Sequence, residues 1–162
     1  MSFPIDYQKE FCWPATLRRE RPMVDAFVRI AVAELQGARA SNIEAQGNRV
    51  QFTVAWFRWV GNWNLLTNID TGLIEITPAA GTFRVAYYLS FKRILVQHCI
   101  GALGAFTFVI LPHRILPTSM KILAPVLLFS IVFALNYLIA VGRFSRFIKR
   151  VIARADLECA GL

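Results

Sequence analysis

Two long stretches without a charged residue dominate the second half of the chain. They cover residues 94–111 and 122–141, and as helices they measure about 27 Å and about 30 Å. The hydrocarbon core of a bilayer is roughly 30 Å thick. A soluble protein could bury one such helix, but a chain of 162 residues has little other material to cover two. The pattern therefore predicts a two-helix transmembrane hairpin over residues 94–142.

The residues around the two stretches predict their orientation. The connector, residues 112–121, contains Pro112 and Pro117 and is expected to be a tight loop. It carries only two basic residues, Arg114 and Lys121. The opposite ends of the stretches carry seven: Lys92, Arg93, Arg143, Arg146, Lys149, Arg150 and Arg154. Because basic residues stay on the cytoplasmic side, we expect a two-pass protein of the inner or plasma membrane with both termini cytoplasmic.

Small and polar residues within the stretches suggest how the two helices meet. Gly101 and Ala105 are four residues apart in the first stretch, and Ser130 and Ala134 repeat that spacing in the second. Such pairs allow close backbone approach, although an apolar composition alone also produces them. Asn136 is the most polar residue deep in either stretch. We expect it to bond the first helix or a partner subunit.

A third apolar pattern, with helical period, follows the second stretch in residues 143–162. Its apolar positions are Phe144, Phe147, Ile148, Val151, Ile152 and Ala155. The other face carries Arg143, Arg146, Lys149, Arg150 and Arg154. A basic amphipathic helix beside a membrane span is expected to lie among the lipid headgroups. Packing of the same stripe against the cytoplasmic domain is the alternative.

Residues 1–93 have the alternation of an α+β domain. A helix is predicted from Pro22 to Gly37, because proline favours the start of a helix and glycine its end. Four strands follow at about 42–45, 50–59, 73–76 and 83–91. Residues 6–21 are mixed and are expected to form a short helix or a strap. The fold class is thus a small helix with a four-stranded antiparallel sheet, followed by the hairpin and the basic helix.

Tryptophan residues gather at one edge of the predicted sheet. The fourth strand ends at residue 91 and the first apolar stretch starts at 94, so this edge is expected at the bilayer. An antiparallel meander brings Trp56, Trp59 and Trp63 to the same edge. Tryptophan is typical of membrane interfaces, so we expect Trp59 and Trp63 to dip into the headgroups. Trp56 could instead fill the core.

Composition and charge agree with a membrane protein. Apolar residues make up 56 % of the chain, and the net charge is +8. The basic excess is spread along the chain and partly flanks the apolar stretches, which favours a lipid bilayer over nucleic acid as its partner. Residues 1–10 lack the features of a secretory signal, so insertion is expected to depend on the internal stretches.

Candidate chemistry is sparse. Cys12, Cys99 and Cys159 have no spacing of a metal site or disulfide framework, and motifs of common hydrolases and nucleotide-binding proteins are missing from the sequence. His98 stands early in the first stretch beside small residues. It is a candidate axial ligand of a tetrapyrrole, although an interfacial or helix-packing role is the simpler interpretation.

The expected function is therefore not enzymatic, and no cofactor or metal is expected. The sequence predicts a membrane-anchored binding or scaffolding protein, or a small accessory subunit of a larger complex, with a protein partner or a second copy bound through the hairpin or the sheet. A tetrapyrrole-binding subunit using His98 and an oligomeric channel using Asn136 are the alternatives.

Overall fold

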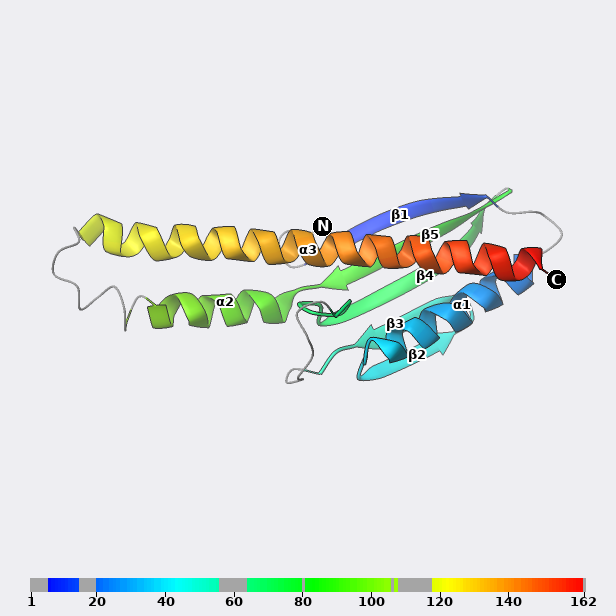
Figure 1. Ribbon diagram of the computed structural model, residues 1–162, viewed down its shortest axis with the longest axis horizontal. Helices are drawn as coiled ribbons and strands as arrows, with labels where there is room; N and C mark the ends of the chain where they lie inside the picture. The colour runs from blue at the N-terminus through cyan, green and yellow to red at the C-terminus, as the bar shows by residue number, and fades with distance from the viewer. Residues whose placement is uncertain are drawn as a thin grey trace.

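A five-stranded antiparallel sheet carries two helices on one face, as a computed structural model shows (Figure 1). The structure describes residues 6–14, 20–55, 64–79, 81–105, 107 and 118–161. The strands are β1 (Asp6–Pro14), β2 (Asn42–Gln46), β3 (Arg49–Thr53), β4 (Thr71–Ala79) and β5 (Thr82–Ser90). Their order in the sheet is β1-β5-β4-β3-β2. The helices are α1 (Glu20–Gly37), α2 (Lys92–Ala105) and α3 (Thr118–Ala160).

The α+β class and the four predicted strands are confirmed, but the sheet has a fifth strand. β1 occupies the region expected to be a short helix or a strap and pairs with β5 over nine residues, from Asp6–Ser90 to Pro14–Thr82. Tyr7, Phe11 and Trp13 face the helices, and their period of two identifies a strand. Lys9 occupies an inward position and obscures that alternation in the sequence. Pro14 is tolerated because it ends an edge strand.

The core lies between the sheet and the two helices. Val50 and Phe52 of β3 point into it, as the alternation predicts, together with Phe27 of α1. Gly72 of β4 makes room for this packing, because a Cβ atom there would collide with the Phe52 ring and touch Leu89. α1 and α3 are joined at the rim by two ion pairs, Arg29–Glu158 and Arg154–Glu34.

α3 is a single helix of 43 residues, about 65 Å long, with two different environments. Its second half crosses the sheet, and its apolar stripe, expected in the headgroup region, is buried instead in the core (Figure 1). Phe144 packs against the rings of Phe52 and Tyr87, with centroid distances of 5.8 Å and 5.1 Å. The prediction of a separate helix lying on the membrane is therefore wrong, and the alternative of packing on the domain holds. The sheet gives this stripe an apolar surface to pack against, as lipid would, and α1 packs beside α3.

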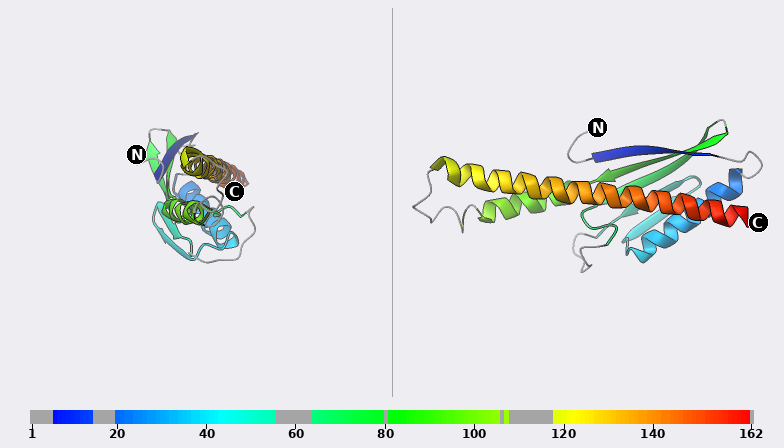
Figure 2. Two further views of the ribbon diagram at one scale, coloured as in Figure 1. Left: turned by 90° about the vertical axis from the view of Figure 1, so that its left-hand side faces the viewer. Right: turned by 45° about the horizontal axis from the view of Figure 1, so that its top comes forward.

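The first half of α3 and α2 lie side by side and extend beyond the sheet (Figures 1 and 2). Pro125 is accommodated inside α3. In the part of the chain that the structure describes, the large exposed apolar side chains belong to these two segments, apart from Tyr88 and Leu157. They are Val96, Ile100, Leu103, Leu123, Val126, Leu127, Leu128, Ile131, Val132, Leu135, Leu138 and Ile139.

One described helix, α3, is long and apolar enough to span a membrane. The candidate span is Leu123–Ala160, and its most apolar window has a mean hydropathy of 2.3 with only 22 % of it buried. A core helix of a soluble protein would be mostly buried. The described part of α2 has 14 residues, about 21 Å, which is shorter than a span. The structure thus supports one candidate span where the sequence predicts two; residues 106 and 108–117 lie outside the described part.

Candidate functional site

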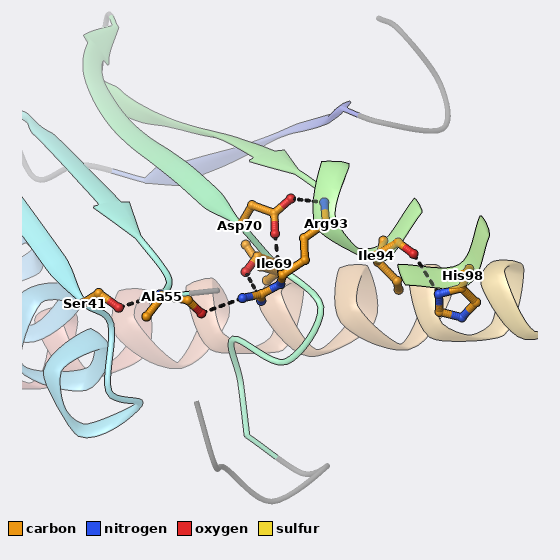
Figure 3. A network of polar contacts seen from close by, with 7 residues as sticks. All are labelled: Ser41, Ala55, Ile69, Asp70, Arg93, Ile94 and His98. Carbon is orange, nitrogen blue, oxygen red and sulfur yellow. Dashed lines mark hydrogen bonds and ion pairs between the residues drawn. The ribbon is translucent and has the colours of Figure 1, made fainter. Parts of the chain in front are cut away.

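A densely bonded polar group lies where β5 ends and α2 begins, which we call the junction (Figure 3). Arg93 is 7 % exposed at the start of α2. Its guanidinium donates from Nη1 to the carbonyl of Ala55 at 2.6 Å and from Nη2 to the carbonyl of Ile69 at 3.1 Å. Its Nε lies 3.2 Å from Oδ1 of Asp70. One side chain therefore ties α2 to both ends of the loop between β3 and β4.

Asp70 caps α2 from a different part of the chain. Its Oδ2 accepts a hydrogen bond from the backbone nitrogen of Arg93 at 2.5 Å, which satisfies a donor in the first turn of α2. Its own backbone nitrogen donates to Ser90 of β5, and its carbonyl accepts from Val54. Burial raises the pKa of the Asp70 carboxyl, although the bond to Arg93 and the guanidinium charge act in the opposite direction. The result is a partly dry ion pair at the point where sheet and helix meet.

The junction was not predicted from the sequence, where Arg93 was placed only among the basic residues that set orientation and Asp70 was not a candidate. A signal for it was present. An antiparallel meander brings the start of β4 and the end of β5 to one edge, so Asp70 and Arg93, just outside these strand ends, belong at the same place. The Arg93 guanidinium and the Asp70 carboxylate are already bonded to one another and to backbone groups. Their role is therefore to hold α2 in position against the sheet.

Two predicted residues, His98 of α2 and Asn136 of α3, come together farther along the two helices. Nδ2 of Asn136 lies 3.3 Å from Nε2 of His98. Nδ1 of His98 lies 2.7 Å from the Ile94 carbonyl (Figure 3). With Nδ1 donating to that carbonyl, Nε2 is left to accept from the amide. Oδ1 of Asn136 accepts in turn from Nδ2 of Asn68 at 3.4 Å. Of the two expectations for Asn136, the structure places its amide against the first helix.

Aromatic rings complete the contact between α2 and α3. The His98 ring meets the edges of Phe129 and Phe133 at centroid distances of 5.7 Å and 5.8 Å. Phe91 and Tyr137 continue the contact toward the sheet at 4.8 Å. A cleft of about 250 Å³ opens beside His98, lined also by Gln97, Gly101, Pro125, Leu128, Phe129 and Val132.

The position of His98 does not suit an axial ligand. Iron would need the lone pair of Nε2, and this atom faces the Asn136 amide. Within the described residues, no three His, Cys, Asp or Glu side chains gather in a way that could hold a metal ion. The geometry favours the helix-packing role, which belongs to the simpler interpretation of His98 drawn from the sequence.

The predicted small-residue positions do not carry the described contact between the helices. A Cβ atom on Gly101 would meet nothing within 4 Å. Ser130 and Ala134 are exposed, and the Ser130 hydroxyl donates to the Val126 carbonyl of its own helix. Nothing is described of the Ala105 side chain. The helices meet instead through His98, Asn136 and the aromatic residues.

The predicted interface residues are only partly placed. Trp56, Trp59 and Trp63 lie outside the described residues, and Ala55, the last described residue before them, accepts a hydrogen bond from Arg93. Arg146, Lys149, Arg150 and Arg154 are exposed on the second half of α3, and Arg143 is half-buried. Because α3 is one unbroken helix, these basic residues follow one another along its second half (Figure 1).

Comparison with known proteins gives no family. The sequence matches no protein-family model. Neither the curated proteins nor the solved structures show a significant similarity to the chain. Function has to be inferred from the junction and from the two projecting helices.

Proposed function

We propose that the protein is a membrane-anchored, non-enzymatic binding or scaffolding protein, or a small accessory subunit of a larger membrane complex. The observation that carries the proposal is the concentration of large exposed apolar side chains on α2 and the first half of α3. A soluble protein rarely exposes a contiguous apolar patch of this extent. The burial of such side chains in lipid, at about 25 cal/mol per Å², would hold the domain firmly at a bilayer.

In this proposal, α2 and the first half of α3 form a two-pass hairpin with both termini in the cytoplasm. The residues that connect them would lie on the far side. Arg143 and Arg146 follow the apolar half of α3 within about 8 Å along the helix, close enough to reach headgroups, whereas Arg154 is about 20 Å away. Arg154 forms an ion pair with Glu34 of α1, which agrees with a place inside the cytoplasmic domain.

The open face of the sheet is the surface we assign to a protein partner. α1 and α3 cover the opposite face, and the open face carries the ion pairs Arg49–Glu75 and Arg84–Glu10. A hollow of about 560 Å³ lies near its junction end and includes Gln8, Gln51, Leu73 and Tyr88 in its lining. The junction fixes this face relative to the hairpin, so a bound partner would be held in a defined orientation.

The native cysteines provide a test of anchoring and orientation. Cys12 is exposed on β1 and Cys159 is buried, while Cys99 is exposed on α2, where lipid would shield it. We expect the protein to resist carbonate extraction, and a membrane-impermeant maleimide to label it in inverted vesicles but not in intact cells. Cys12→Ser should abolish this labelling. Recovery in the supernatant would refute the anchoring, and labelling in intact cells would refute the orientation.

Scaffolding itself is tested by site-specific crosslinking in membranes. A photo-crosslinking residue at Leu73, on the open face, should give a discrete crosslinked species with another protein. The same group at Leu157, exposed on the far part of α3, is the matched control and should give none. The absence of a crosslink from several open-face positions, Gln51 and Thr77 included, would contradict the assignment of this face.

A further inference from the structure

Two lysine residues from distant parts of the sequence converge on one aromatic ring at the side of the sheet. The Nζ atoms of Lys9, on β1, and of Lys149, on α3, lie 5.1 Å and 5.8 Å from the centroid of the Phe11 ring. Nζ of Lys9 also donates to Oγ of Ser145 at 3.4 Å. Two ammonium groups and a hydroxyl therefore share one small surface, which we call the lysine pair.

The lysine pair has no carboxylate to balance it among the described residues. The ion pairs found there involve Arg29, Arg49, Arg84, Arg93 and Arg154. Glu10, the neighbour of Lys9 in the chain, points to the opposite face of the sheet and lies 3.7 Å from Arg84. Two like charges brought together without a counter-ion repel each other, so an anion between them would be stabilising.

The direction of the side chains points the positive charge toward the hairpin. Side chains of a helix lean toward its N-terminus, and the N-terminal half of α3 is the apolar half. Arg146 shows this directly, because its Nε bonds back to the Gly142 carbonyl at 3.3 Å. Ser145 follows the end of the predicted apolar stretch by about 6 Å and Lys149 by about 12 Å along the helix. In the proposed anchoring, a Lys149 side chain directed toward the apolar half of α3 would bring its ammonium group close to the headgroup region.

We propose that the lysine pair, Lys9 and Lys149 with Ser145 and Arg146 beside them, binds the phosphate of an anionic phospholipid at the cytoplasmic surface of the membrane. The inference rests on the proposed membrane anchoring and specifies a partner for it. The ammonium groups supply the charge, and the Ser145 hydroxyl supplies an adjacent donor. The bound lipid would join β1 to α3 where both ammonium groups lie near the Phe11 ring.

The experiment measures lipid selectivity of the full-length protein reconstituted in phosphatidylcholine vesicles. Spin-labelled phosphatidylglycerol and spin-labelled phosphatidylcholine report the fraction of lipid held at the protein surface. We expect a preference for phosphatidylglycerol that weakens as salt rises. A basic residue near a membrane surface strengthens anionic binding by about fivefold, so Lys9→Gln with Lys149→Gln should remove most of the preference. Lys9→Arg with Lys149→Arg should retain it.

The matched control neutralises two cations of the open sheet face, Arg49→Gln with Arg84→Gln, and should leave the preference unchanged. Equal binding of the two lipids by the wild-type protein would overturn the inference, and so would a preference that survives the double glutamine variant. Suppression of the preference by millimolar inorganic phosphate would also overturn it, since it would indicate a site for a soluble anion. In each of these outcomes the protein still inserts into the vesicles. The lipid-binding inference would then fail while the membrane anchoring would stand.

Discussion

Asp70 holds Arg93 through both the backbone and the side chain of the arginine. The Asp70 carboxylate lies 2.5 Å from the Arg93 backbone nitrogen with one oxygen and 3.2 Å from Nε with the other. The first contact caps α2 and the second balances a buried charge. No linker separates β5 from α2, so this pair sets the angle between the sheet and the helix.

Removal of the arginine charge should make the stability of the protein depend on pH. Arg93→Met leaves the Asp70 carboxylate partly buried without its cation and should lower the free energy of unfolding by about 3 kcal/mol near pH 7. The pKa of Asp70 is already raised by burial, and loss of Arg93 raises it further. A raised carboxyl pKa means that the folded state gains stability as pH falls through it, so the cost should shrink toward pH 5.

Unfolding by denaturant in detergent micelles, at both pH values, checks this prediction. Arg49→Met is the control, because its ion pair with Glu75 is exposed and should be worth less than about 1 kcal/mol at either pH. Adding Asp70→Asn to Arg93→Met should remove the pH dependence. A cost of Arg93→Met that is the same at both pH values would contradict the assigned role of Asp70.

The contact of His98 with Asn136 should couple the two helices. Asn136→Leu removes the amide that faces Nε2 of His98 and the oxygen that accepts from Asn68. Interhelical hydrogen bonds between membrane helices are worth about 0.6 kcal/mol on average. A double-mutant cycle with His98→Ala should give a coupling energy of that order, measured by unfolding in micelles. Ser130→Ala, which affects only a bond within α3, should show no coupling with His98→Ala.

Gly72 should be intolerant of even one added methyl group. Gly72→Ala places a Cβ atom against the Phe52 ring and Leu89, which are both buried, and overpacking of this kind costs about 1–3 kcal/mol. Gly37→Ala is the matched control. A Cβ atom there meets nothing within 4 Å, so stability should stay the same or rise slightly. Thermal unfolding followed by circular dichroism would compare the two, and equal midpoints would refute the packing around Gly72.

Phe144 distinguishes packing on the sheet from packing in lipid. It is fully buried between Phe52 and Tyr87, so Phe144→Ala should cost about 3–5 kcal/mol. Leu157→Ala, on the same half of α3 but 74 % exposed, should cost less than about 0.5 kcal/mol. Hydrogen exchange of β3 and β5 amides should accelerate in the first variant only. A small effect of Phe144→Ala would favour the headgroup position expected from the sequence.

The sequence predicts the elements whose hydrophobic period is undisturbed. Val50 and Phe52 alternate with polar neighbours and form β3, and the helix from Pro22 to Gly37 corresponds to α1. β1 was not predicted because Lys9 stands among its inward residues and Pro14 suggests a break. Neither feature prevents an edge strand. The Lys9 side chain reaches the surface beside α3, and Pro14, which has no N–H to donate, stands at the end of the strand.

The candidate site was harder to predict because it depends on which elements meet. Asn136 was singled out as a polar residue that bonds the first helix or a partner subunit, and its amide lies beside His98 in the structure, but the sequence did not indicate which residue of α2 stands opposite it. The amphipathic stripe from Phe144 to Ala155 was recognised, but the choice between headgroups and the cytoplasmic domain as its partner stayed open, because lipid and a sheet both present apolar surfaces. Arg93 appeared as one basic residue among seven until the meander brought Asp70 to it.

The unbroken course of α3 makes the apolar half and the sheet-packed half one rigid rod. The junction fixes α2 to the sheet as well, so within the described residues the projecting halves of α2 and α3 join the sheet without a flexible linker. In a bilayer that changes thickness, mismatch would tilt the rod, and a tilt of about 10° would sweep the far end of α3 sideways by about 5 Å. In the proposed anchoring, the position of the domain over the membrane surface would therefore depend on the thickness of the bilayer.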